Sequence, residues 1–208
     1  MSDFRSFAVI PAAGQSLRMG APKLLLPWRG IRLLEATLAP WKASGVEQMI
    51  VVVRPDDPDL ALLCREQGVE VVVPSVPPPE MKTSVQLALT HIEKEFAPSP
   101  RDAWLLAPAD MPCLSPDIIR RLLAEHSADT QAILIPTLQG KRGHPVLFPW
   151  VLAPQVHTLG ENEGLNALRN RHSWREVPCD DCPTTGGNPF LDIDTPEEYL
   201  EGRGEKLQ

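Results

Sequence analysis

Short apolar runs alternate with helical patterns along the chain, and this alternation predicts the fold. Most of the apolar runs are continuous, which is typical of parallel strands covered on both faces. They occupy residues 7–12, 49–53, 69–73, 103–107, 132–136, 144–148 and 190–193. Together with the helical patterns between them, they predict an α/β fold with one doubly wound, mainly parallel sheet. We expect a single domain over residues 1–208.

Three helices are indicated by residue spacing and capping signals. In residues 83–96 the apolar positions recur on one helical face. Helices are also predicted over residues 115–125 and from Thr195 onward, because each begins with a capping residue followed by proline. The proline-rich residues 73–80 are predicted to form a rigid loop rather than a domain linker. The apolar positions of the first helix are Val85, Ala88, Leu89, Ile92 and Phe96.

Composition narrows the class of protein. Of the 208 residues, 43% are hydrophobic and 23% are charged, which is ordinary for a soluble globular protein. No apolar run approaches eighteen residues, so no transmembrane helix or membrane partner is expected. The amino terminus does not have the pattern of a secretion signal, so a cytoplasmic location is expected. The net charge of −7 argues against nucleic acid as a partner.

The strongest chemical signal lies in the loop after the first predicted strand. Gly14 and Gly20 bound this loop, and two cations, Arg18 and Lys23, lie within and just after it. Backbone amides of such a loop can surround an anion, and Arg and Lys add charge for phosphate oxygens. Five residues separate the glycines and Leu24 follows the lysine, so this is not a P-loop; the Gly-x-Gly-x-x-Gly dinucleotide pattern is also missing. The loop therefore predicts a site for a polyphosphate.

Residues 12–27 read Ala-Ala-Gly-x-Ser-x-Arg-Met-Gly-x-x-Lys-Leu-Leu-Leu-Pro, and this stretch resembles the opening of the MobA-like nucleotidyltransferases. The resemblance is closest to the molybdopterin cytidylyltransferases. It implies the Rossmann-like fold of nucleotide-diphospho-sugar transferases, with Arg18 and Lys23 as catalytic residues. The nucleotide-binding positions that it implies here are Ala12, Ala13, Gly14, Ser16, Arg18, Met19, Gly20 and Lys23.

The resemblance also implies the reaction. A nucleoside monophosphate would pass from a nucleoside triphosphate to the phosphate of molybdopterin or the molybdenum cofactor, with Mg²⁺ as cofactor and pyrophosphate as the second product. Within such transferases Ala-Ala-Gly in the first loop goes with CTP and Ala-Gly-Gly with GTP, and this chain has Ala13 at the deciding position. Pro11 replaces the usual leucine, so the end of the strand departs from the pattern. The expected substrate is CTP.

An aspartate follows the strand predicted over residues 103–107. Asp110 lies between Ala109 and Met111, with prolines on either side of this group. A carboxylate at the end of a strand is well placed to hold Mg²⁺ bound to phosphates, although aspartate also caps turns. The segment resembles the family's Ala-Asp-Met-Pro element, whose aspartate is the metal ligand. Asp110 is therefore our candidate catalytic and metal-binding residue.

A second pair of carboxylates lies near the carboxyl end of the chain. Asp192 and Asp194 would share one face of an extended strand. The segment resembles the family's Asp-x-Asp-Thr-Pro-Glu-Asp element, in which the aspartate before Thr-Pro approaches the metal. Asp194 is thus the second candidate metal ligand, with helix capping as its alternative. Asp192 is a weaker candidate, and Glu198 is expected to be structural.

Gly143 and His144 begin a segment that resembles the family's Gly-His-Pro-Val-Leu-Phe element, which lines the pocket of the second substrate. His144 could equally be a buried, hydrogen-bonded histidine at the start of a strand. Lys141 and Arg142 could bind the phosphate of that substrate, or form an ordinary solvated pair.

The start of the helix over residues 83–96 resembles a Gly-Met-x-Ser-Ser-Leu stretch that contacts the nucleotide in relatives. Thr83 and Ser84 retain the hydroxyl groups, and a helix amino terminus favours anions. Glu80 and Lys82 depart from that pattern. Thr83 with Gln86 also fits an ordinary capping box.

Cysteines give no functional signal. Cys179 and Cys182 have the spacing of half a zinc site, but no second Cys or His pair lies near them in the sequence. We interpret them as reduced thiols on a surface loop and assign them no role.

Alternatives to the leading hypothesis remain. The same chemistry could act on a sugar or alditol phosphate, or could use GTP. A non-catalytic nucleotide-binding module is a different class, against which the complete set of Arg18, Lys23 and Asp110 argues. An oxidoreductase dependent on NAD is weakened by the missing glycine pattern. The expected partners are small-molecule substrates, with transient contact to an acceptor molybdoenzyme or its chaperone implied by the resemblance.

Overall fold

The computed structural model describes residues 4–16, 18–126, 131–184 and 186–204. Its strands are β1 (Ser6–Pro11), β2 (Pro27–Trp28), β3 (Ile31–Arg32), β4 (Gln48–Val52), β5 (Glu70–Val72), β6 (Ala103–Leu106), β7 (Ile133–Leu138), β8 (Lys141–Arg142), β9 (Val146–Pro149) and β10 (Trp174–Pro178). Its α-helices are α1 (Leu33–Ser44), α2 (Pro58–Glu66), α3 (Met81–Phe96), α4 (Pro116–Glu125), α5 (Ala153–Val156), α6 (Asn166–Arg171) and α7 (Pro196–Arg203). Short 3₁₀ turns span Lys23–Leu25 and Trp150–Leu152.

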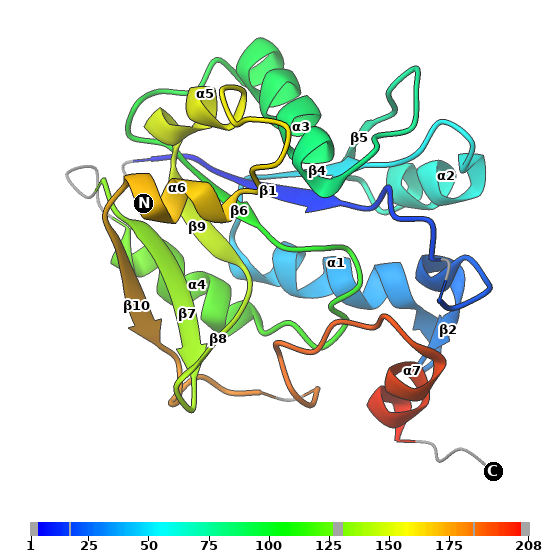
Figure 1. The fold of residues 1–208 in the computed structure, drawn as a ribbon. Coiled ribbons are helices and arrows are strands. Elements are labelled where there is room, and N and C mark those ends of the chain that lie inside the picture. Colours follow the sequence, from blue (N-terminus) through cyan, green and yellow to red (C-terminus); the bar gives the residue numbers. More distant parts are fainter. Residues whose placement is uncertain (1–3, 17, 127–130, 185, 205–208) are drawn as a thin grey trace.

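The main sheet has the strand order β10-β7-β9-β6-β1-β4-β5, with β8 paired to β7 (Figure 1). Strand β1 pairs in parallel with β4 and β6, and β4 pairs in parallel with β5. Strand β9 is antiparallel to both of its neighbours, β6 and β7. Strands β2 and β3 form a separate hairpin. The structure confirms the predicted α/β fold with a doubly wound, mainly parallel sheet.

Helices cover both faces of this sheet, which explains why its central strands are continuously apolar. In β1, Ala8 and Ile10 pack into one core with α1, α2 and α4, whereas Phe7 and Val9 pack into a second core with α3, α5 and α6. Within the second core, Trp104 of β6 stacks on Phe148 of β9 with ring centroids 4.2 Å apart. Because alternate side chains of β1 are buried in opposite cores, the strand cannot shift along the sheet, and its carboxyl end is held in place.

Helix starts follow the predicted capping in two of three cases. Ser115 accepts a hydrogen bond from the Asp117 amide at the start of α4, and Thr195 forms a capping box with Glu198 at the start of α7. Helix α3 begins at Met81, with Glu80 as the preceding cap residue, and no side chain caps it. Thr83 therefore lies inside the first turn, so the capping-box alternative for this residue was wrong.

The structure differs from the predicted strands at residues 190–193 and at β10, and the two-residue strands β2, β3 and β8 were not predicted either. Residues 190–193 form no strand; Ile193 makes one backbone hydrogen bond, from its amide to the Asp110 carbonyl at 3.0 Å, and the segment is otherwise irregular. Strand β10 was not predicted, because it is an edge strand whose first three side chains, Trp174, Arg175 and Glu176, are exposed.

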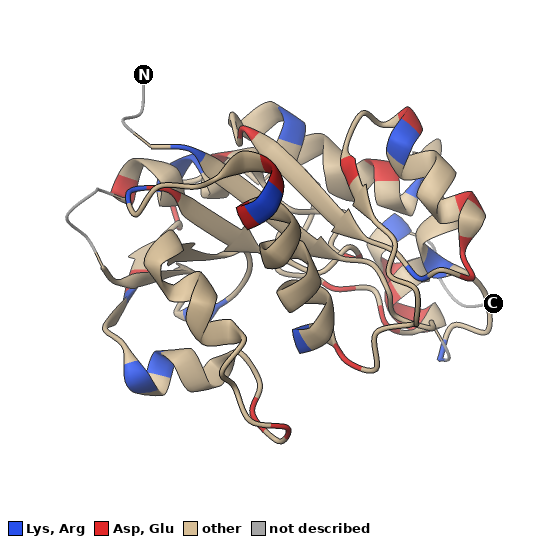
Figure 2. Cartoon of the chain, turned by 90° about the horizontal axis from the view of Figure 1, so that it is seen from above, with Lys and Arg blue, Asp and Glu red and all other residues tan. Residues whose placement is uncertain are grey.

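The distribution of surface charge and the length of the helices can be compared with what the composition predicted. Figure 2 shows residues of both signs intermixed over the helices and loops. Within the part of the chain that the structure describes, every helix is too short or too polar to cross a membrane.

Candidate nucleotide-binding site

The carboxyl ends of β1, β4 and β6 open into a cleft of about 590 Å³. Because these strands are parallel neighbours, the loops that follow them meet at one edge of the sheet, where ligands bind in open α/β folds. The cleft is bounded by the loop after β1, the loop after β6, the first turn of α3 and the proline-rich loop before it. Its lining includes Ala12, Ala13, Gly14, Ser16, Arg18, Lys23, Arg54, Glu80, Met81, Ser84, Asp110 and Asp194.

Lys23 joins the two candidate metal-binding carboxylates at the base of the cleft. Its Nζ donates to Asp110 Oδ2 at 2.6 Å and to Asp194 Oδ1 at 2.9 Å. A third bond runs from the same Nζ to the Ile193 carbonyl at 2.7 Å. Lys23 is 9% exposed, so this ammonium group is held away from bulk water. Three chain segments that are remote in sequence are thus brought together by one side chain.

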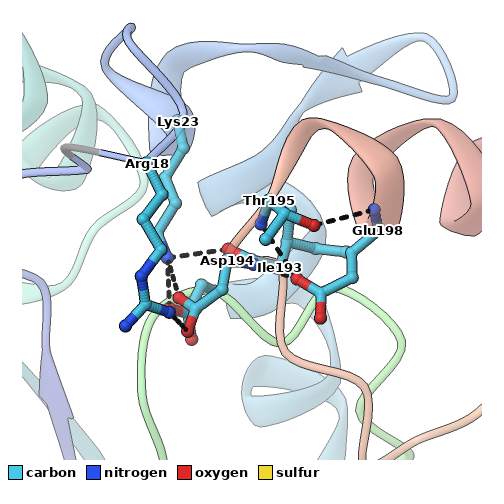
Figure 3. A network of polar contacts seen from close by, with 7 residues as sticks. Arg18, Lys23, Ile193, Asp194, Thr195 and Glu198 are labelled. Carbon is cyan, nitrogen blue, oxygen red and sulfur yellow. Dashed lines mark hydrogen bonds and ion pairs between the residues drawn. The ribbon is translucent and has the colours of Figure 1, made fainter.

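Arg18 adds a second cation at the outer side of this network. Its guanidinium donates to Asp194 Oδ2 at 3.0 Å, and Figure 3 shows Arg18 and Lys23 reaching the same carboxylate from one segment. The Arg18 side chain is 74% exposed, so solvent screens this pair and it adds little to stability. Arg18 is consequently free to exchange Asp194 for another anion.

Asp194 is held in place by the start of α7. Its backbone amide and that of Thr195 both donate to the Glu198 carboxylate, at 2.8 and 2.9 Å. The Asp194 side chain is left to face Lys23 and Arg18 rather than to cap the helix, because Thr195 does the capping. This arrangement excludes the helix-capping alternative for Asp194 and agrees with the structural role expected for Glu198.

The charges in this network shift one another's titration. Burial raises the pKa of Asp110 above its ordinary value, even though Lys23 opposes that shift. The hydrogen bond from Lys23 lowers the pKa of Asp194. Burial alone would lower the pKa of Lys23, but the charge of Asp110 and the bonds to both carboxylates raise it, so the ammonium stays protonated. A buried carboxylate beside a fixed cation is a pattern found at functional sites.

The donor set fits a hard divalent cation that also binds phosphate. Asp110 Oδ1 is buried and has no hydrogen-bond partner, so one oxygen of this carboxylate is available to a ligand. Mg²⁺ commonly takes one or two carboxylates and completes its shell with phosphate oxygens and water. Among the described residues no group of three or more His, Cys, Asp or Glu side chains could hold a metal ion alone. Asp110 and Asp194 together could hold such a cation only with further ligands from a bound phosphate or water.

Three predicted binding residues lie outside the lining of this cleft. Gly20, at φ +63°, lines a neighbouring depression that shares Gly14 and Ser16 with the cleft. Met19 closes a turn in the same loop, where its amide donates to the Ser16 carbonyl at 3.0 Å. Thr83 is half-buried in the first turn of α3, beside the cleft-lining Ser84. Their contact with a nucleotide stays a prediction.

Gly143 and His144 also lie outside the cleft lining, and both have structural contacts. His144 Nδ1 donates to the Leu106 carbonyl at 3.1 Å, and burial lowers the pKa of its imidazole, so the ring is neutral. A Cβ on Gly143 would lie 2.2 Å from the Phe190 ring, which explains why glycine is needed there. These contacts match the hydrogen-bonded histidine of the alternative reading, although His144 is half-buried and lies two residues before β9. A place in a second substrate's pocket stays a prediction.

The neighbouring pair Lys141 and Arg142 is exposed. Arg142 donates to Glu176 at 2.8 Å and lies over the Trp174 ring, 4.5 Å from its centroid. Arg142 is therefore an exposed surface residue, as the alternative of an ordinary solvated pair predicted.

Cys179 and Cys182 correct one interpretation, because they are buried rather than on a surface loop. Cys179 is fully buried and Cys182 is 9% exposed. The Cys182 amide donates to the Cys179 carbonyl in a tight turn, and burial raises the pKa of Cys179 to about 12. Both residues are thiols that pack in the core of α1 and α4.

Sequence reasoning missed two charged residues that line the cleft. Arg54 lies two residues after the end of β4 and donates to Asp56 in two hydrogen bonds of 2.8 and 2.6 Å. Glu80 was noted only as a departure from a pattern, and its carboxylate lies 3.1 Å from Lys82 Nζ. The signal for Arg54 was its place immediately after the strand predicted over residues 49–53, since Asp110 was likewise singled out near the end of a predicted strand.

Comparison with known proteins identifies the family of this chain. The family model of the MobA-like NTP transferase domain matches residues 8–177. The nicotine blue oxidoreductase of Paenarthrobacter nicotinovorans is 26% identical over 91% of this chain and 92% of that protein. The molybdenum cofactor cytidylyltransferase of Escherichia coli K12 is 24% identical over 94% of each. The crystal structure of Rv0371c from Mycobacterium tuberculosis in complex with manganese is 26% identical, with a TM-score of 0.74 over 97% of this chain and 100% of that one. With a match over most of its length and the loop, lysine and carboxylates at one sheet edge, the chain belongs to the family of MobA-like NTP transferase domains.

Proposed function

We propose that this protein transfers a nucleoside monophosphate from CTP to the phosphate of molybdopterin or the molybdenum cofactor and releases pyrophosphate. The observation that carries the proposal is the meeting of Lys23, Asp110 and Asp194 opposite the glycine-bounded loop after β1. Cations and an anion-binding loop face a pair of carboxylates there, as a triphosphate with its metal requires. The cytidylyltransferase of Escherichia coli, similar over nearly its full length, supports the choice of reaction.

The residues of the cleft divide the work of phosphoryl transfer. Amides around Gly14 and the Arg18 guanidinium bind the phosphates, and Lys23 neutralises charge beside Asp110. Asp110 and Asp194 would hold a divalent cation, which supplies charge neutralisation on phosphate oxygens. Rv0371c, whose crystal structure contains manganese, supports a divalent metal in this family. Positioning and charge then account for catalysis, without a covalent intermediate.

The acceptor needs no general base. A phosphate monoester is already an anion, so its oxygen can form the new bond to the α-phosphorus while the bond to the pyrophosphate oxygen breaks. His144 agrees with this view, because its neutral ring is occupied in a bond to the Leu106 carbonyl. The protein's contribution is to align two anionic groups that would otherwise repel each other.

Ala13 is the basis for choosing CTP. It lines the cleft and is 9% exposed, so its methyl group narrows the space beside a bound base. A smaller pyrimidine fits such a space better than a purine. We expect Ala13→Gly to raise the ratio of GTP to CTP turnover, with the other substrate at saturation.

The direct test measures pyrophosphate release from each of the four nucleoside triphosphates, with Mg²⁺ and molybdenum-loaded molybdopterin. Release with CTP is expected. Release with GTP alone would show that the Ala13 reasoning is wrong, and release only with a sugar or alditol phosphate would replace the acceptor. Nicotinamide cofactor oxidation, measured in parallel, tests the redox activity that the name of the Paenarthrobacter relative suggests.

Asp110→Ala should abolish turnover while the fold is retained, because it removes a proposed metal ligand whose side chain is 16% exposed and lies 2.6 Å from Lys23 Nζ. Glu66→Ala, on the exposed end of α2, is the matched control. Near-full activity of the Asp110 variant would mean that the metal is held elsewhere. We also propose that the protein is a single-domain enzyme of the cytoplasm. Its product would pass to a molybdoenzyme or to the chaperone of that enzyme.

A further inference from the structure

Lys82 is a buried lysine that the proposed reaction does not use. It is 7% exposed and belongs to the first turn of α3. Glu80 and Met81 before it and Ser84 after it all line the cleft. Lys82 itself is not part of the cleft lining. Because a lysine is almost never fully buried without partners, the contacts of its ammonium group indicate what it does.

The Lys82 ammonium is directed to a segment that is remote in sequence. Its Nζ donates to the Gly160 carbonyl at 2.7 Å and to the Glu161 carbonyl at 3.1 Å. The third partner is the Glu80 carboxylate at 3.1 Å. One side chain thus joins a cleft-lining carboxylate to the loop between α5 and α6.

A second residue of α3 makes a parallel contact with the same region. Gln86 lies one helical turn after Lys82, and its Nε2 donates to the Val156 carbonyl at 3.0 Å. The loop is braced internally, since Glu163 accepts from the Gly160 amide at 2.9 Å and pairs with Arg171 of α6. Residues 156–163, here named the strap, are therefore fastened to the face of α3 that points away from the cleft.

The first turn of α3 depends on such support from behind. No side chain caps this helix, so its first amide groups are left for other acceptors, and the turn faces the cleft through Met81 and Ser84. The preceding proline-rich loop, residues 74–80, contains the exposed Val76 and shows no helix or strand that would hold it in place. The strap therefore supports the first turn of α3, residues 81–84, which forms one wall of the cleft.

We infer that Lys82 is a positioning residue, which couples the strap to the wall that binds the nucleotide. This inference rests on the proposed function, because it assigns the wall to the nucleoside triphosphate. It adds that the loop between α5 and α6, which contacts Lys82 from 78 and 79 residues further along the chain, takes part in nucleotide affinity without contacting the nucleotide. If this wall moves out of place, the nucleotide binds with lower affinity, although the reacting groups are unchanged.

The variant test compares Lys82→Met with Lys94→Met. Lys94 lies near the other end of α3 with its side chain 80% exposed, so it controls for loss of a helix lysine. We expect Lys82→Met to raise the Kd of CTP with Mg²⁺, measured by calorimetry, by about tenfold. The KM for CTP should rise likewise while kcat stays within about twofold. A general loss of fold would instead lower the active fraction and kcat at an unchanged KM.

Hydrogen exchange on the unchanged protein provides a test that needs no folded variant. Addition of CTP with Mg²⁺ should slow amide exchange both in residues 81–84 and in the strap. Protection of residues 81–84 alone, or an unchanged Kd in a folded Lys82→Met protein, would overturn the inference and leave the proposed function intact. If the unchanged protein bound neither CTP nor GTP, the proposed function would be overturned and the inference with it.

Discussion

Replacement of Lys23 by methionine tests the electrostatic account of the site. The substitution keeps the length of the side chain and removes the ammonium group that joins Asp110, Asp194 and the Ile193 carbonyl. Loss of one partner from a buried ion pair costs about 3–5 kcal/mol, because the remaining charge has no counterpart. The Asp194 side chain is 43% exposed and can be hydrated, which reduces the cost. We expect Lys23→Met to lower the free energy of unfolding by about 2–4 kcal/mol at pH 7.5.

The dependence on pH has a definite sign. Burial already raises the pKa of Asp110 in the intact protein, and loss of Lys23 removes the cation that opposes this shift. Folded Lys23→Met protein should then bind a proton at Asp110 more readily than the unfolded chain does. Its deficit in unfolding free energy, relative to the unchanged protein, should shrink as the pH falls from 7.5 to 5.5.

The assay is urea unfolding of the unchanged protein, Lys23→Met and the double variant with Asp110→Asn, with Lys42→Met as an exposed control. The second substitution should restore more than half of the lost stability, because it removes the uncompensated charge. Mn²⁺ should stabilise Lys23→Met more than the unchanged protein, since a cation between Asp110 and Asp194 replaces the missing ammonium. A loss below about 0.5 kcal/mol in Lys23→Met, or a double variant less stable than it, would refute the reasoning.

Two further predictions concern the scaffold around the site. Gly143→Ala should lower the free energy of unfolding by about 1–3 kcal/mol, because its Cβ would lie 2.2 Å from the Phe190 ring; a thermal melt equal to that of the unchanged protein would contradict the packing. Asp102→Asn should cost about 2–3 kcal/mol in urea unfolding, because the buried carboxylate accepts bonds from the backbone amides of Arg5 and Ser99 and from the Arg5 guanidinium. Burial alone would raise the pKa of Asp102, but these donors lower it, so its contribution is present above about pH 4 and lost as the pH falls through the lowered value. An acid unfolding profile of Asp102→Asn parallel to that of the unchanged protein would exclude this contribution.

The central strands could be predicted from the sequence because a strand buried on both faces is a continuous run of apolar residues. Residues 7–12 and 103–107 are continuous apolar runs, and they became β1 and β6 with side chains in both cores. The same criterion failed at the edge of the sheet, where Trp174–Pro178 exposes most of its side chains. It also failed at residues 190–193, where the buried Ile193 anchors an irregular segment to the Asp110 carbonyl rather than a strand.

The site was predictable as far as local motifs reach. The loop after β1 and the aspartates at positions 110 and 194 were singled out from their neighbours in sequence, and the structure brings Arg18, Lys23, Asp110 and Asp194 together. Lys82 shows the limit of this reasoning. A lysine in an amphipathic helix usually faces water, and only the fold places carbonyl groups from residues 160 and 161 within reach of it.

The reversed direction of β9 has a consequence for how such a protein can diversify. An antiparallel strand starts where its parallel neighbours stop, so β9 delivers residues 143–145 to the same edge of the sheet as Asp110. The β7–β8 hairpin just before it is a surface turn, which tolerates insertion and exchange. The length and sequence of this hairpin can therefore change without a change in the buried strands β1, β4 and β6, which position the cleft.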